Sequence, residues 1–234
     1  MDYLKSEHLK FKRTISNKLI FIVPLITAIF AWIMGGYMGY QYMTLYWWYA
    51  FLLPGAIAIL CSLSHGKEEN AGKYYSVFSM PVNLSRFEFA KCIILVEKLL
   101  VSAIFLALLI SISNIIAPAT AVYSLLHSIT GSIGIILASV WQIPLCLYLA
   151  RKTGMFVPIV LNTILGIVLS TATALGNTIA WWFVPYCWAA KLAEPLMGIE
   201  MNGTYAGNCG FSIAIMISIL LSILLFLILS YADA

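Results

Sequence analysis

The stretch LIFIVPLITAIFAWIMGGYMG at residues 19–39 carries no charged side chain. A helix of about 20 apolar residues is long enough to cross the hydrocarbon core of a bilayer, so this run predicts a membrane span. The run is too long for the apolar region of a cleaved signal, which has about 7–15 residues. The sequence predicts an all-α, polytopic membrane protein with six transmembrane helices, because comparable runs recur at residues 45–64, 92–116, 128–150, 155–176 and 209–231.

The composition indicates one membrane domain over residues 1–234. Hydrophobic residues make up 62% of the chain and charged residues only 9%, whereas soluble domains have roughly 25% charged residues. This much apolar surface requires lipid as the solvent. The basic residues are few and flank apolar runs, which argues against nucleic acid as a partner.

Lys and Arg gather in the segments that would share one side of the membrane. The segments of the other side hold Lys191. Because positively charged segments stay in the cytoplasm, both termini are predicted to be cytoplasmic, with residues 40–44, 117–127 and 177–208 outside. The cytoplasmic residues behind this prediction are Lys5, Lys10, Lys12, Arg13, Lys18, Lys67, Lys73, Arg86, Lys91, Arg151 and Lys152.

The leading segment, residues 1–18, has an amphipathic pattern. Leu4, His8, Phe11 and Ile15 recur at helical spacing, with basic residues around the other side. This pattern predicts a helix that lies flat on the inner leaflet, where its cations meet anionic lipid. The alternative is a disordered basic tail.

Residues 65–91, between the second and third spans, are too long for a plain turn and too apolar for a solvated linker. Glu68 and Glu69 are expected to open a helix, because acidic residues stabilise its positive N-terminal end. Pro81 would stop that helix. A second short helix is expected from Ser85, with Ser85 as N-cap and Glu88 at the capping-box position. The apolar face of the first helix comprises Tyr74, Val77 and Phe78 at i, i+3 and i+4.

Two features inside the predicted spans invite a functional interpretation. Glu97 and Lys98 lie near the start of the third span, where long side chains can reach the interface. Gly35, Gly36 and Gly39 form a small-residue patch with Gly-x-x-x-Gly spacing, which lets a second helix approach closely. Packing within the chain and packing between two chains both remain open for this patch.

The segment between the second and third spans resembles that of ABC type-2 permeases. The resemblance rests on the acidic pair, Gly72, the apolar turn, Pro81-Val82, a Ser-Arg cap and Lys91. In that family the first helix of this segment is the coupling helix, which docks in a groove of an ATP-binding subunit. The resemblance implies contact with that subunit through Glu68, Glu69, Gly72, Tyr74, Val77, Phe78 and Pro81.

Three further stretches are similar to lantibiotic immunity permeases of the MutE/EpiE or MutG type. They are residues 5–14 (KSEHLKFKRT), the run from Trp47-Trp48-Tyr49 to Leu53-Pro54-Gly55, and the run from Met197-Gly198-Ile199 to Asn202-Gly203. The resemblance implies two ATP-binding subunits, and a second permease subunit, the same or related. It also implies short helices outside the membrane before the last span.

The enzyme alternatives find little support in the sequence. The phosphate-binding pattern Gly-x-x-x-x-Gly-Lys-Ser/Thr is missing, so we expect no ATPase activity and no cofactor, with ATP and Mg²⁺ held by a partner subunit. The run Glu68-Glu69-x-x-x-Lys73 approaches a motif of intramembrane CAAX-type proteases. His127 is predicted on the opposite side from the other histidines, so a metal site is not expected.

Two groups of residues could contact a substrate. Outside the membrane, residues 177–208 carry an aromatic shelf of Trp181, Trp182, Tyr186 and Trp188, and such residues favour the bilayer interface. A simple anchoring belt is the alternative. Within the spans, Gln142, Asn162 and Thr163 are typical of interhelical contacts, and Asn162 is also a possible substrate contact.

Together these observations predict the permease subunit of an ATP-driven exporter in the bacterial cytoplasmic membrane. The expected substrate is a lantibiotic or a similar antimicrobial peptide, expelled for self-protection or resistance. A non-transporting scaffold or sensor subunit is one alternative, and a type-2 exporter of another lipophilic substrate is a second. Co-purification with an ATP-binding protein distinguishes a permease from a scaffold.

Overall fold

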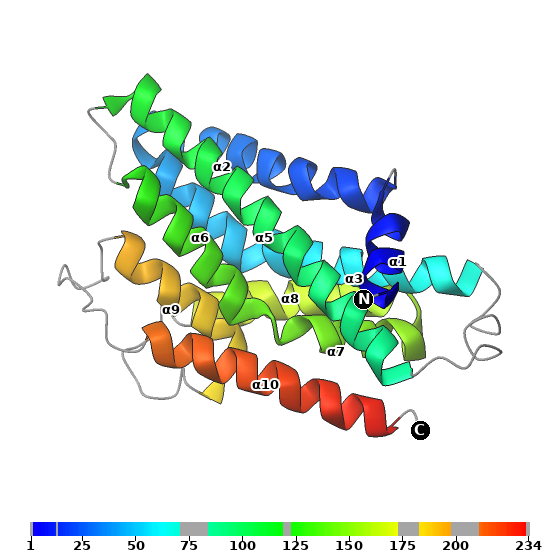
Figure 1. Cartoon of the computed structure of the whole chain (residues 1–234). Helices are drawn as coiled ribbons and strands as arrows, with labels where there is room; N and C mark the ends of the chain where they lie inside the picture. The colour runs from blue at the N-terminus through cyan, green and yellow to red at the C-terminus, as the bar shows by residue number, and fades with distance from the viewer. Residues whose placement is uncertain are drawn as a thin grey trace.

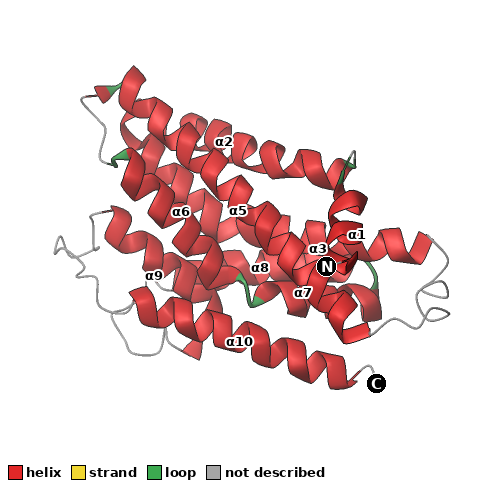
Figure 2. Cartoon of the chain, in the orientation of Figure 1, coloured by secondary structure: helices red, strands yellow, loops and turns green. Residues whose placement is uncertain are grey.

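The computed structural model describes residues 2–12, 14–70, 84–118, 123–172, 183–197 and 211–232. Within these ranges the regular structure is helical and contains no strand (Figure 2), which confirms the all-α prediction. The elements, in chain order, are α1 (Asp2–Phe11), α2 (Ile15–Trp47), the π-helix η1 (Trp48–Leu52), α3 (Leu53–Asn70), α5 (Leu84–Ile116), α6 (Leu125–Ser139), α7 (Gln142–Thr153), α8 (Phe156–Ala172), α9 (Pro185–Met197) and α10 (Phe211–Ala232).

The helix α2 is a hairpin with two arms. The ring centroids of Phe30 and Trp47 lie 4.8 Å apart, although a straight helix would separate these residues by about 25 Å. The chain reverses at Gly36, whose φ of 55° and ψ of −159° are a combination that essentially only glycine adopts. Residues 40–44, predicted to lie outside between the first two spans, are helical and belong to the returning arm, so the connection between the arms lies earlier, at Gly36. The side of the membrane on which these residues lie stays a prediction.

The glycine patch of the sequence lies at this reversal. A Cβ atom on Gly35 would lie 2.8 Å from Cγ of Met43 in the returning arm. Gly39 is looser, since its Cβ would lie 3.9 Å from the same atom. In this structure the patch therefore serves packing within the chain.

The returning arm is interrupted just before α3. The amide of Leu53 bonds to the carbonyl of Trp48, as in a π-helix, and Pro54 follows without an amide to donate. Helix α8 packs antiparallel to α3. Ser62 donates to the carbonyl of Met155 over 3.2 Å, while a Cβ on Gly166 would lie 2.8 Å from Cγ of Pro54.

The helix α5 runs unbroken from Leu84 to Ile116. The sequence predicts a separate short helix at its start, with Ser85 as N-cap and Glu88 in a capping box. The structure corrects this, because the two residues lie in the first turns of α5 itself. Glu88 is instead paired with Lys91, Nζ to Oε1 over 3.4 Å.

Helices α6 and α7 meet at a bend of 46°. The predicted span at residues 128–150 covers both. Helix α9 lies beside α6 (Figure 1), and its second residue, Tyr186, packs edge-on against Trp141 at the bend, with ring centroids 4.8 Å apart. Helix α1 and the end of α10 lie at the same end of the bundle (Figure 1).

The number of membrane spans stays a prediction. By length and composition, two helical stretches of the described chain could cross a membrane, residues 15–70 and 86–116, and the bent pair α6 and α7 could form a third. The first stretch includes the hairpin of α2. Shorter apolar helices cover residues 156–170 and 216–228. The finding supports a membrane protein without confirming six spans.

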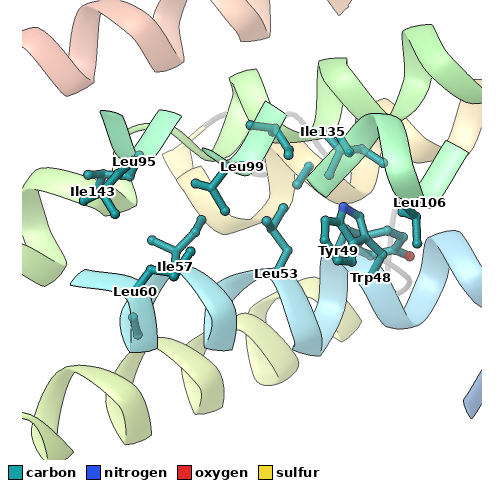
Figure 3. Close-up of a cluster of buried hydrophobic side chains, with 14 of the residues drawn as sticks. Trp48, Tyr49, Leu53, Ile57, Leu60, Leu95, Leu99, Leu106, Ile135 and Ile143 are labelled. Carbon is teal, nitrogen blue, oxygen red and sulfur yellow. The ribbon is translucent and has the colours of Figure 1, made fainter. Parts of the chain in front are cut away.

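The largest buried cluster lies between α3, α5, α6 and α7. Trp48, Leu53 and Ile57 meet Leu106 and Ile135 there (Figure 3). The outer surface is apolar as well: Ile33, Phe156 and Leu220 are exposed for more than half of their area. An apolar exterior over a close-packed interior fits a chain that has lipid as its solvent.

Candidate functional site

A cluster of ion pairs lies where α1 meets the last turn of α3. The ammonium of Lys10 is 2.6 Å from Oε1 of Glu7 and 2.5 Å from Oε1 of Glu68. Both carboxylates are withdrawn from the surface, since Glu7 is 1% exposed and Glu68 is 6% exposed. One cation therefore neutralises two buried carboxylates, and this shared ion pair joins α1 to α3.

A second lysine, Lys67 on α3, completes this contact. The ammonium of Lys67 donates to the carbonyl of Lys10 over 3.3 Å and to Oγ1 of Thr14 over 3.2 Å. It also lies 4.5 Å from the centre of the Phe11 ring, which is fully buried. Helix α1 is thus held on α3 by charge, by hydrogen bonds and by a buried aromatic ring.

The same end includes the first turns of α5 and the last turn of α7. The Phe87 ring contacts two cations, since its centre lies 4.8 Å from Nζ of Lys10 and 4.4 Å from Nζ of Lys91. Glu88 lies 3.9 Å from a guanidinium nitrogen of Arg151. We call this assembly of α1 with the ends of α3, α5 and α7 the charged end.

The electrostatics of the charged end keep Lys10 protonated. Burial disfavours its charge, but the hydrogen bonds to Glu68 and Glu7 outweigh that effect, so the pKa of Lys10 is raised above its ordinary value. A permanent cation at this position suits a structural tie better than proton transfer.

The pair Glu97 and Lys98 also faces α1. Nζ of Lys98 is 3.1 Å from Oε1 of Glu97 and 3.5 Å from Nδ1 of His8. Lys98 is buried and His8 is half exposed. The first half of α5 therefore lies at the level of α1, and the part of α5 without charged residues begins after Lys98.

The structure corrects the predicted roles of the two glutamates. Glu68 and Glu69 lie in the last turn of α3 and do not open a helix. Glu68 is buried against Lys10, whereas the Glu69 side chain is 58% exposed and lies 3.7 Å from His65. The remaining predicted coupling residues, Gly72, Tyr74, Val77, Phe78 and Pro81, lie outside the described residues.

The leading helix is present but shorter than the predicted segment. Its inward face presents Glu7 and Phe11 to the protein, while Leu4 and Ile15 of the predicted apolar stripe are exposed. Ile15 already belongs to α2. The predicted helix is therefore confirmed, Phe11 of the predicted stripe packs against the protein, and the place of the helix on the inner leaflet stays a prediction.

The predicted aromatic shelf is not formed by its described members. Tyr186 and Trp188 are buried inside the bundle, and Trp181 and Trp182 lie outside the described residues. Asn162 is buried too, and its amide bonds to the carbonyl of Pro54 over 2.7 Å and to Oε1 of Gln142 over 3.0 Å. These are the interhelical contacts expected of such residues.

Sequence reasoning missed Glu7, Lys10 and Phe87 as members of one cluster. The i, i+3 pair of Glu7 and Lys10 is visible in the sequence, but contact with Glu68 depends on the fold. In the part of the chain that the structure describes, no group of three or more His, Cys, Asp and Glu side chains could hold a metal ion.

A family model described as ABC-2 family transporter protein matches residues 3–169, which is more than two thirds of the chain and includes the whole charged end. No curated protein and no solved structure matches the chain. The permeases of this family are membrane transport components rather than ATPases, and they act with an ATP-binding cassette partner. The matched region, the apolar exterior and the helical bundle together place the chain in the ABC-2 transporter family, as a membrane permease of an ABC exporter.

Proposed function

We propose that this permease expels a lantibiotic or a similar antimicrobial peptide from the bacterial cytoplasmic membrane. It acts with two ATP-binding subunits, which bind ATP and Mg²⁺, and with a second permease, the same or related. The charged end faces the cytoplasm, because it gathers Lys10, Lys67, Lys91 and Arg151.

One observation carries the coupling part of this proposal. Lys10 contacts Glu68, which lies just before residues 71–83, and Phe87, which lies just after them. The helix α1 therefore fixes both stems from which the predicted coupling segment extends. A segment that passes movement from an ATP-binding subunit to the spans needs such a fixed base, since rigid elements carry coupling between sites.

The substrate part rests on the resemblance to lantibiotic immunity permeases. A peptide that inserts into the outer leaflet is expected to bind the permease at the membrane interface, where aromatic side chains can contact its apolar face. Since Tyr186 and Trp188 are buried, we assign the initial contact to Trp181 and Trp182.

Co-purification tests the coupling part. The tagged chain, expressed with its candidate ATP-binding subunit, should retain that subunit in detergent, and Lys10→Met should release it or uncouple its ATPase. Lys12→Met is the matched control, because Lys12 is exposed on the same segment. Equal retention and equal substrate-stimulated ATPase in both variants would contradict the role of the charged end.

Survival tests the substrate part. Cells that express the complete transporter should grow at a higher lantibiotic concentration than cells without the permease. Trp182→Ala, combined with Trp181→Ala, should lower that concentration while leaving assembly unchanged. If deletion of the permease leaves lantibiotic sensitivity unaltered, the substrate assignment is wrong.

A further inference from the structure

The lysines in and next to α1 differ from those of α5 in whether they have a partner. Lys10 of α1 and Lys91 and Lys98 of α5 form ion pairs with carboxylates at 2.5 to 3.4 Å. Lys5 and Lys12 are exposed, and among the described residues no carboxylate forms an ion pair with either of their ammonium groups. The charge of these two lysines is available to a partner outside the chain.

The two exposed lysines lie on one face of the leading helix. Lys5, Leu9 and Lys12 follow one another at i, i+4 and i+7, the spacing of a single helix face. Lys12 is one residue past α1, but its amide still makes a helical bond of 3.3 Å to the carbonyl four residues earlier. Glu7 and Phe11 form the other face and are buried against the protein. We call the face of Lys5, Leu9 and Lys12 the outer face.

Apolar side chains are exposed between these lysines. Leu9 is 63% exposed, and Ile15, at the start of α2, is 69% exposed. Cations and apolar residues therefore alternate along the exposed residues Lys5, Leu9, Lys12, Ile15 and Lys18. This composition is typical of helices that lie in the interface of a bilayer, because the apolar side chains enter the acyl boundary while the ammonium groups stay among the headgroups.

The position of the outer face in the bundle matches such an interface. Helix α1 lies across the end of α2 and does not continue it (Figure 1). Beyond Lys18 the exposed side chains of α2 are apolar, with Phe21, Ile22 and Leu25 in its next turns. These side chains form the surface expected to meet acyl chains. The outer face therefore begins where the apolar exterior of α2 ends, at the level expected for lipid headgroups.

The carboxylates around α1 leave the outer face positively charged. Glu7 is 1% exposed and Glu68 is 6% exposed, and both are paired with Lys10. Glu97, beside α1 on α5, has a side chain that is 46% exposed, but Lys98 neutralises it over 3.1 Å. The charge that remains without a partner at this surface is positive, and it complements the phosphate groups of anionic lipids.

We propose that the outer face, continued by Ile15 and Lys18, binds anionic phospholipids of the cytoplasmic leaflet. The ammonium groups contact the lipid phosphates, while Leu9 and Ile15 enter the acyl boundary. Lysine is a compact charge on a flexible stem, so the surface recognises the negative charge of the headgroup and not one lipid species.

Lipid bound at the outer face also acts on the base of the predicted coupling segment. On the inward side of the same helix, Lys10 contacts Glu68 and Phe87, which flank that segment. An anionic leaflet that holds α1 in place supports these contacts. This consequence rests on the proposed function, and it predicts higher ATPase activity of the complex in vesicles of phosphatidylglycerol than in vesicles of phosphatidylcholine.

Lipid titration of the full chain tests the surface. Phosphatidylglycerol is added to the chain purified in detergent, and native mass spectrometry gives the affinity. Lys5→Gln combined with Lys12→Gln should lower that affinity roughly thirtyfold, because each lysine at an anionic headgroup contributes about a factor of five. The retention test of the coupling part is run in detergent without anionic lipid, so the Lys12→Met control there does not depend on the outer face.

Arg86→Gln combined with Lys152→Gln is the matched control. Both residues are exposed cations of the charged end, on α5 and α7, so this pair removes the same charge away from α1. It should keep the parent affinity for phosphatidylglycerol. Equal affinities of the two double variants would show attraction by net charge alone and would overturn the proposal. A parent chain that binds phosphatidylcholine as tightly as phosphatidylglycerol would overturn it too.

A spin label tests whether the outer face lies in the leaflet. In a variant without native cysteines, a nitroxide at Leu9 should be shielded from a water-soluble relaxation reagent in nanodiscs of phosphatidylglycerol. A nitroxide at Glu69, whose side chain is 58% exposed in the last turn of α3, should stay accessible. Equal accessibility of the two labels would place the outer face in water and contradict the proposal.

An acidic surface of the ATP-binding subunit is the competing partner for these lysines. If Lys5→Gln with Lys12→Gln keeps the lipid affinity of the parent and instead releases that subunit, the outer face binds protein and the proposal is wrong. If no ATP-binding subunit co-purifies with the parent chain, the proposed function fails. The lipid titration of the chain alone still decides the lipid surface in that case.

Discussion

The ammonium of Lys10 lies 2.5 Å from the carboxylate of Glu68, although the two residues are 58 positions apart in the sequence. The same ammonium neutralises Glu7, one turn earlier on its own helix. This bridge makes the leading helix part of the folded permease. It also places a partly buried ion pair directly before the segment predicted to contact the ATP-binding subunit.

Replacing Lys10 should loosen the leading helix. Lys10→Met leaves the buried carboxylates of Glu7 and Glu68 without their shared cation, and we expect a loss of about 1–3 kcal/mol, because the lysine itself is partly exposed. Lys10→Arg should restore part of the loss. Thermal unfolding in detergent measures the effect, and unaltered stability of Lys10→Met would show that the bridge is not needed.

The two glutamates at the end of α3 should respond differently. Glu68→Gln removes the charge partner of Lys10 and should release the leading helix, which limited proteolysis after residues 10–13 would detect. Glu69→Gln alters a side chain that is 58% exposed and should be cleaved at the parent rate. Equal cleavage of the two variants would contradict the assignment of Glu68 as the tie.

The contribution of Lys10 should persist over the ordinary pH range. Its pKa in the folded chain is raised above 10.5, so its stabilising effect is fully present below that pH and is lost as the pH rises through the folded-state pKa. The difference in melting temperature between the parent and Lys10→Met should stay constant from about pH 6 to 10 and shrink above pH 10.5. A difference that already disappears near neutral pH would assign the effect to another group.

The reversal at Gly36 should require glycine. Gly36→Ala forces a side chain into a φ of 55° and ψ of −159°, which costs on the order of 1–3 kcal/mol. Gly39→Ala is the control, since its Cβ meets only Met43 at 3.9 Å and alanine favours the helix. The melting temperatures of the two variants measure this difference. If both variants melt at the same temperature, the reversal at residue 36 does not require glycine.

The class of protein and its family can be read from the amino-acid sequence alone. Runs of apolar residues as long as a bilayer is thick permit little besides membrane helices. Helices α8 and α10 lie within a few residues of the predicted spans at 155–176 and 209–231, and α5 contains the predicted span at 92–116 but begins earlier, at Leu84. Charge bias also grouped Lys10, Lys67, Lys91 and Arg151 on one side, and these residues do lie at one end of the bundle.

The roles of the polar residues depend on the fold and could not be predicted from the sequence. Periodicity describes one helix at a time, so it could not show that Glu68 is paired with Lys10, that Gly36 reverses α2, or that Tyr186 turns inward to Asn162. These contacts join segments distant in the sequence. Their partners are selected because a buried charge or amide must find a complementary group wherever the packed helices bring one within reach.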